Sequence, residues 1–139
     1  MTDLLAQGRA QLAAARWFLD HADAGPAGVW PRAAAVLARQ ALGSGFAALW
    51  SIRAPGLAQT TARCQLSCLP SVLRDDATAG EAAYTWSMLS RACHHRTYEL
   101  APTASELQAR LGAVQRVLGV IERRCGSAAG SSSSTLAGG

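Results

Sequence analysis

The side chains best equipped for chemistry lie together in one short stretch of the chain. It reads Arg91-Ala92-Cys93-His94-His95-Arg96-Thr97-Tyr98. Histidine titrates near neutral pH, so its imidazole can accept and return a proton under physiological conditions. Arginine holds phosphate through paired hydrogen bonds and stabilises developing negative charge. These groups suit metal-independent cleavage of RNA, in which the 2′-hydroxyl supplies the nucleophile.

The spacing within this stretch places its polar groups on neighbouring faces of a helix. If the stretch is helical, Arg91 and His95 share one face, and His94 and Tyr98 share the next. A structural interpretation stays open, because histidine and arginine are also favoured at the C-terminus of a helix, where they offset the helix dipole.

Cysteine and tryptophan offer two further interpretations. Cys64 and Cys68 lie four residues apart, and with His94 and His95 they would make a Cys2His2 zinc site. Buried cysteine is also an ordinary small apolar residue, and we expect no metal and no cofactor. The four tryptophans are scattered along the chain, which favours packing over the stacking of bases.

The elements that must position these groups are predicted to be helices. No segment alternates polar and apolar residues as a half-buried strand would. Thr2 is expected to cap the first helix, and two threonine–glutamate pairs with capping-box spacing, Thr78–Glu81 and Thr103–Glu106, are expected to open the last two. The predicted helices span about residues 3–22, 31–53, 57–73, 79–94 and 104–125, with Pro70 interrupting the third.

The last of these helices carries the clearest apolar seam, and it defines the domain boundary. Its apolar residues recur at steps of four and three, as on one face of a helix: Leu107, Leu111, Val114, Leu118, Ile121 and Cys125. Gly126 is expected to stop the helix. The sequence therefore predicts an all-α bundle of four long helices and one short one over residues 1–125, followed by a flexible Gly/Ser/Ala tail over residues 126–139.

Charge and hydropathy restrict the partners. The chain has 139 residues and a net charge of +4, and residues 31–74 hold five arginines and no acid. Such a surface can meet RNA, DNA or an acidic partner. The longest uncharged run before the tail, between Arg39 and Arg53, has 13 residues, whereas a membrane span needs roughly 20. With no targeting signal in view, we expect a cytoplasmic protein that does not enter the membrane.

The segment from Leu89 to Leu100, followed by Ala101-Pro102-Thr103 and a helix, resembles the HEPN superfamily. Within it, the chain is similar to the small, alanine- and arginine-rich HEPN-like proteins of high-GC bacteria. The resemblance implies a helical bundle that forms a homodimer and engages RNA. Many members are metal-independent endoribonucleases of toxin or defence systems, so an antitoxin protein is a further expected partner.

The resemblance also implies roles for individual residues. Arg91 corresponds to the motif arginine, and His95, with His94 as the alternative, to the histidine that acts as general base. Arg96 would hold the scissile phosphate with Arg91, and Tyr98 would orient an imidazole or a phosphate oxygen. The alternative is a non-catalytic helical interaction module that binds a protein partner or nucleic acid, in which the same stretch only fastens the end of its helix.

Overall fold

The computed structural model describes residues 3–22, 29–94 and 100–137 of the chain. Every regular element within these ranges is helical, so the all-α prediction is confirmed. The elements are α1 (Leu4–Asp20), α2 (Val29–Arg53), the 3-10 helix η2 (Pro55–Gln59), α3 (Ala62–Leu73), α4 (Asp76–Cys93) and α5 (Ala104–Ala137). None of the helices in this part of the chain is long and apolar enough to cross a membrane.

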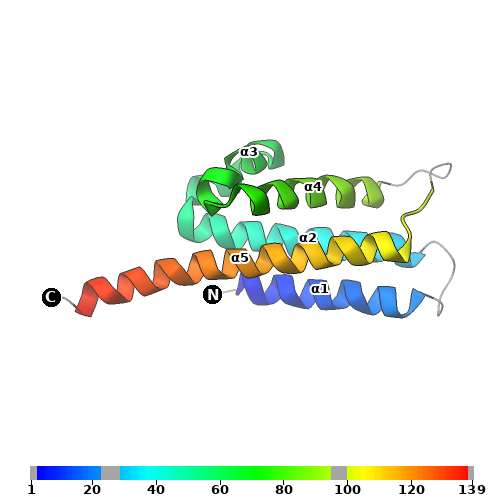
Figure 1. Cartoon of the computed structure of the whole chain (residues 1–139), viewed down its shortest axis with the longest axis horizontal. Helices are drawn as coiled ribbons and strands as arrows, with labels where there is room; N and C mark the ends of the chain where they lie inside the picture. The colour runs from blue at the N-terminus through cyan, green and yellow to red at the C-terminus, as the bar shows by residue number, and fades with distance from the viewer. Residues whose placement is uncertain (1–2, 23–28, 95–99, 138–139) are drawn as a thin grey trace.

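The four long helices lie side by side along the long axis of the molecule (Figure 1). α1 and α4 run in one direction, and α2 and α5 run in the other. α2 packs against α1, α4 and α5, whereas the short α3 lies at one end against α4 and η2. This central place of α2 explains its broad apolar surface, since it must supply side chains to three neighbours at once.

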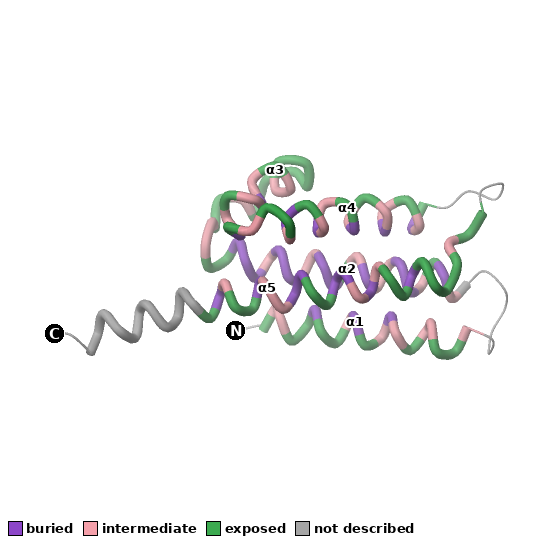
Figure 2. Tube along the Cα trace, in the orientation of Figure 1, coloured by how far each residue is buried: buried purple, intermediate pink, exposed green. Residues whose placement is uncertain are grey.

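The core follows the seam that the sequence predicts on the last helix. All six of its residues are buried, and α2 contributes Leu42, Leu49 and Trp50 to the same cluster. In Figure 2 the buried positions of α1 and α4 fall on the sides of these helices that face α2 and α5, in the middle of the bundle. The hydrophobic effect acting on this shared surface holds the four long helices together.

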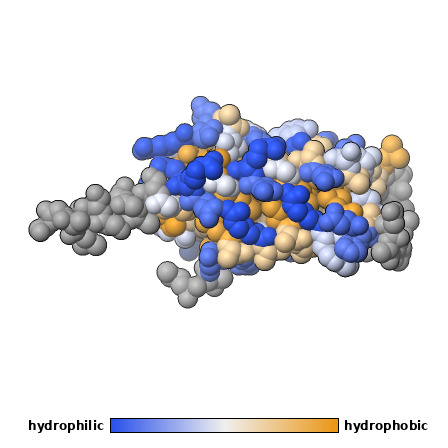
Figure 3. All heavy atoms as spheres, turned by 60° about the horizontal axis from the view of Figure 1, so that its bottom comes forward, coloured by the Kyte–Doolittle hydropathy of each residue, from blue (hydrophilic) through white to orange (hydrophobic). Residues whose placement is uncertain are grey.

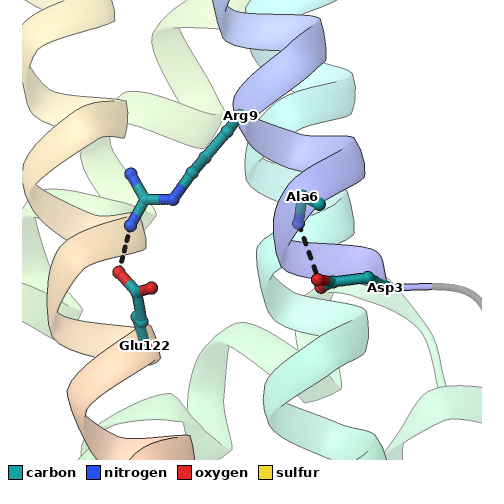
Figure 4. Close-up of polar contacts among 4 residues, drawn as sticks. All are labelled: Asp3, Ala6, Arg9 and Glu122. Carbon is teal, nitrogen blue, oxygen red and sulfur yellow. Dashed lines mark hydrogen bonds and ion pairs between the residues drawn. The ribbon is translucent and has the colours of Figure 1, made fainter.

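Two helices begin differently from the prediction, because aspartate takes the capping position. Asp3, not Thr2, caps α1, and its carboxylate accepts a hydrogen bond of 3.1 Å from the amide of Ala6 (Figure 4). α4 begins at Asp76, earlier than predicted, because the carboxylate of Asp75 accepts hydrogen bonds from both the amide and the hydroxyl of Thr78, at 3.0 and 2.8 Å. A carboxylate also gains from the positive end of the helix dipole, which a threonine hydroxyl does not.

The expected capping box at the start of the last helix is confirmed. The hydroxyl of Thr103 accepts from the amide of Glu106, and the carboxylate of Glu106 accepts from the amide of Thr103, both at 3.1 Å. The third predicted helix, in contrast, is divided. The 3-10 helix η2 ends at Thr60. Thr61 then caps α3, because its hydroxyl accepts a hydrogen bond of 3.2 Å from the amide of Cys64.

Proline and glycine interrupt the helices less than the sequence suggests. Pro70 lies inside α3, which continues to Leu73, and the carbonyl of Pro70 still accepts from the amide of Arg74 at 3.0 Å. α5 continues past Gly126 to Ala137. A helical glycine costs only about 1 kcal/mol relative to alanine, so it weakens a helix without ending it unless it turns to a positive φ.

Polar contacts also connect the helices at the surface. Arg9 on α1 forms an ion pair with Glu122 on α5 (Figure 4), and Arg116 on α5 donates to Glu81 on α4 at 2.9 Å. Figure 3 views the bundle from the side of α1 and shows hydrophilic and hydrophobic surface interspersed. Exposed ion pairs of this kind stabilise a fold by at most about 1 kcal/mol, so the apolar core is the main source of stability.

A basic pocket between α2 and α4 as candidate functional site

A pocket of about 400 Å³ lies between the N-terminal half of α2 and the C-terminal half of α4. The helices run antiparallel here, so the start of α2 lies beside the end of α4 (Figure 1). The residues that line it are Arg32, Val36, Arg39, Gln40 and Gly43 of α2, Trp86 and Cys93 of α4, and His94, the C-cap of α4. Its size is within the range of small-ligand sites.

Helical periodicity brings these side chains together. Arg32, Val36, Arg39 and Gly43 are separated by four, three and four residues, so they form one stripe along α2. The ring of Trp86 packs close to the stripe at Gly43, where a Cβ built on the glycine would lie 3.9 Å from it, at ordinary van der Waals distance.

Arg39 is held in place by an aromatic ring. Its Cζ lies 4.7 Å from the ring centroid of Trp86, and Trp86 in turn packs against Phe46 with centroids 6.0 Å apart. Such a cation–π contact restricts the guanidinium while leaving its N–H groups free to donate. The Nε of Arg39 is buried without a hydrogen-bond partner among the described residues.

The described lining of the pocket is basic. Arg32 and Arg39 line it, and no acid does so among the residues that the structure describes. Burial raises the pKa of the Cys93 thiol, and the opposing attraction of Arg39 and Arg32 does not cancel that effect. Cys93 is therefore a protonated thiol at neutral pH and not a thiolate nucleophile, so the arginines are the groups available to a ligand.

The structure describes two of the five predicted site residues, Arg91 and His94. His94 lines the pocket, and its amide donates to the carbonyl of Arg91 at 3.2 Å. Arg91 itself is exposed and is not one of the lining residues. The other three predicted site residues, His95, Arg96 and Tyr98, lie outside the described residues. The catalytic roles assigned to these positions stay predictions.

Sequence reasoning did not select Arg32, Arg39 or Trp86 as site residues. The available signal was the acid-free segment 31–74, in which Arg32 and Arg39 are seven residues apart and so share one face of a helix. What the sequence lacks is the partner of that face. Trp86 lies more than forty residues later, and only the packing of α4 on α2 brings it to the arginines.

The two cysteines of the zinc hypothesis lie far from its described histidine. Cys64 and Cys68, exposed and half-buried, are on α3, which lies beside the start of α4, whereas His94 is the C-cap at the other end of α4 (Figure 1). His95 lies outside the described residues. The described part of the chain holds no group of three or more His, Cys, Asp or Glu side chains that could bind a metal ion. In comparisons with known proteins, no family model, curated protein or solved structure matches this chain.

Proposed function

We propose that this chain is a HEPN-like RNA-engaging domain and that the pocket between α2 and α4 is a point of contact with RNA phosphate. The observation that carries the proposal is the pairing of Arg32 and Arg39 in one pocket, with no acid among the lining residues that the structure describes. A guanidinium donates to two oxygens of one phosphate at once. The stacking of Arg39 on Trp86 fixes one of the two guanidiniums before a ligand arrives.

The dimensions of the pocket favour single-stranded RNA over a folded protein as its ligand. A volume of about 400 Å³ suits one nucleotide, and sequence-selective RNA recognition commonly uses unpaired bases beside aromatic rings and arginine planes. In the proposal two copies of the chain act as a homodimer. His94 supplies an imidazole at the edge of the pocket, where it could accept a proton from a 2′-hydroxyl without a metal.

The test is the binding of a fluorescent single-stranded RNA of about 12 nucleotides, followed by anisotropy from 50 to 300 mM salt. Arg32→Gln and Arg39→Gln should each weaken binding about tenfold and reduce the dependence of affinity on salt, because each removes one phosphate contact. Arg63→Gln is the matched control: Arg63 is an exposed arginine of α3 that is not in the pocket. Equal losses in all three variants would contradict a specific site, since they would reflect net charge alone.

A second surface favours the alternative, a module that binds a protein partner such as an antitoxin. A groove of about 320 Å³ lies between α4 and the start of α5 and is lined by Tyr84, Met88, Leu107 and other residues. Tyr84 is 56% exposed, and the guanidinium of Arg110 lies over its ring at 5.0 Å. Arginine and tyrosine are enriched where proteins bind one another. If the pocket variants leave RNA binding unchanged, this function becomes the better account.

A further inference from the structure

Three arginines meet where α2 and α3 end against α5. Arg53 is the last residue of α2, Arg74 is the C-cap of α3, and Arg124 lies on α5. The Nη2 of Arg53 donates to the main-chain carbonyl of Arg124 at 3.0 Å, and the Nε of Arg124 donates to the carbonyl of Val72 at 3.2 Å. These bonds connect the three elements and hold the side chains of Arg53 and Arg124 at one end of the bundle, where Arg74 is close enough for its charge to act on Arg124. We call Arg53, Arg74 and Arg124 the arginine cluster.

The positive charge of the arginine cluster has no acidic partner among the described residues. The two ion pairs of the described residues, Arg9–Glu122 and Arg116–Glu81, involve none of the three arginines. The acid that follows Arg74 in the chain, Asp75, has its two carboxylate oxygens engaged by Thr78. The C-termini of α2 and α3 each offer about half a negative charge. Together with the negative charge that the Asp75 carboxylate keeps, they offset only part of the charge of the three guanidiniums.

The guanidiniums of the cluster affect one another. Partial burial, and after it the positive charges of Arg53 and Arg74, lower the pKa of Arg124. The Nε of Arg53 is buried and has no hydrogen-bond partner among the described residues. Cations held together in this way repel, so a bound anion would relieve the repulsion and accept the unused hydrogen bond.

We propose that Arg53, Arg74 and Arg124 form a binding site for a phosphomonoester dianion. A terminal phosphoryl group carries a charge of about −1.5 to −2 and three acceptor oxygens, so it opposes the positive charge of the cluster and offers acceptors to its donors. Guanidiniums approaching from three elements suit a tetrahedral group better than a planar carboxylate. The site is separate from the pocket between α2 and α4, since Arg32 and Arg53 are roughly 30 Å apart along α2.

The test is calorimetric titration of the full chain with pyrophosphate. Arg74→Gln should weaken pyrophosphate binding at least about tenfold, because a charge-assisted hydrogen bond is lost. Arg74→Lys should retain part of the affinity, since it keeps the charge but not the paired donors. Arg63→Gln on the same helix is the matched control and should bind within about twofold of the wild-type protein. Equal binding by Arg74→Gln and Arg63→Gln, or no pyrophosphate binding by the wild-type protein at millimolar concentration, would overturn the proposal.

A thermal melt in phosphate-free buffer separates a binding role from a structural one. The side chain of Arg74 is exposed and makes no hydrogen bond or ion pair with the described residues. Arg74→Gln should therefore melt within about 3 °C of the wild-type protein, since lost attraction to the helix dipole and relieved repulsion oppose each other. A larger fall, with pyrophosphate binding retained, would show that Arg74 only stabilises the end of α3.

Two RNA oligonucleotides of one sequence identify the source of the phosphoryl group, one with a 5′-phosphate and one with a 5′-hydroxyl. If the 5′-phosphate strengthens binding to the wild-type protein but not to Arg74→Gln, the ligand is an RNA end. If the two RNAs bind equally and only pyrophosphate binding depends on Arg74, the ligand is a small phosphorylated molecule. This result does not depend on the pocket variants, because Arg32 and Arg39 lie outside the arginine cluster.

Discussion

The guanidinium of Arg39 lies over the ring of Trp86, with its Cζ 4.7 Å from the ring centroid. This contact joins α2 to α4 beside the candidate pocket. It orients a cation that would otherwise sample many rotamers, and it does so with a ring that cannot neutralise the charge. The pair therefore contributes to the stability of the bundle, and in the proposed function it would also contribute to the affinity of the pocket for RNA phosphate.

A double-mutant cycle measures the Arg39–Trp86 contact. With Arg39→Gln, Trp86→Leu and the double variant, urea unfolding should give a favourable coupling of about 0.5–1 kcal/mol, the range for cation–π pairs that are partly exposed. The cycle of Arg32→Gln with Trp86→Leu is the control, since no cation–π contact with Trp86 is found for Arg32 in the described residues. Equal coupling in the two cycles would mean a general charge effect.

Gly45 marks a close approach of α2 to α5. A Cβ built at Gly45 would lie 2.5 Å from Cδ2 of Leu118 and 3.4 Å from Cδ1 of Ile121. Gly45→Ala should lower the free energy of unfolding by about 1–3 kcal/mol, because the buried leucine must move. At Gly80 on α4 a Cβ meets nothing within 4 Å. Gly80→Ala should stabilise the protein by about 0.5–1 kcal/mol, and destabilisation there would contradict the stated packing.

Thr85 is a polar residue in the core. Its side chain is fully buried on α4, and its hydroxyl has no hydrogen-bond partner among the described residues. Thr85→Val keeps the branched shape and removes the unpaired hydroxyl, so the free energy of unfolding should rise by about 1 kcal/mol. Thr85→Ala is the comparison, because it removes the same hydroxyl together with a methyl group and leaves a cavity. If valine destabilises as much as alanine, the hydroxyl has a partner in solution.

Asp75 gives stability a dependence on pH. Its hydrogen bonds with the amide and then with the hydroxyl of Thr78 lower the pKa of Asp75. Since the pKa is lower in the folded than in the unfolded state, its contribution is complete above about pH 4 and is lost as the pH falls through the folded-state value. Asparagine also caps helices but does not titrate. The difference in Tm between the wild-type protein and Asp75→Asn should therefore shift in favour of the variant between pH 5 and about pH 2; parallel Tm curves would exclude this role.

RNA cleavage distinguishes a catalytic from a binding domain. If the stretch that begins at Arg91 is catalytic, a mixed RNA pool should be cleaved in EDTA. His95→Ala or His94→Ala should then lower the rate about 10²–10⁴-fold, because the general base is lost, and Arg91→Lys should rescue little of an Arg91→Ala defect. Cleavage that needs magnesium, or that survives loss of both histidines, would contradict the mechanism.

A structural role for the same stretch predicts the opposite pattern. The histidine and arginine substitutions would then lower the melting temperature through lost helix-end interactions of about 0.3–1 kcal/mol each. The wild-type protein and all variants would leave RNA intact. A thermal melt of each variant beside the cleavage assay separates the two cases. A catalytic role predicts a lower cleavage rate, whereas a structural role predicts a lower melting temperature.

The sequence by itself determined the features that depend on near neighbours. The period of apolar residues from Leu107 to Cys125 predicted the buried face of α5, and the Thr103–Glu106 spacing predicted its cap. Both are local, because a helix repeats every 3.6 residues and its cap bonds across three. Where two local signals competed, as between Asp75 and Thr78, spacing alone could not select the stronger acceptor.

Only the tertiary structure decided which residues share a site. Arg39 and Trp86 are brought together by the packing of α4 on α2, and Arg53 and Arg124 by the packing of α5 on the end of α2. Each pair is separated by tens of residues, and helical periodicity indicates a face but not the helix that will cover it. That choice depends on how all four long helices bury their apolar faces at once, because the hydrophobic effect is not directional and leaves the pairing to the shape of the whole bundle.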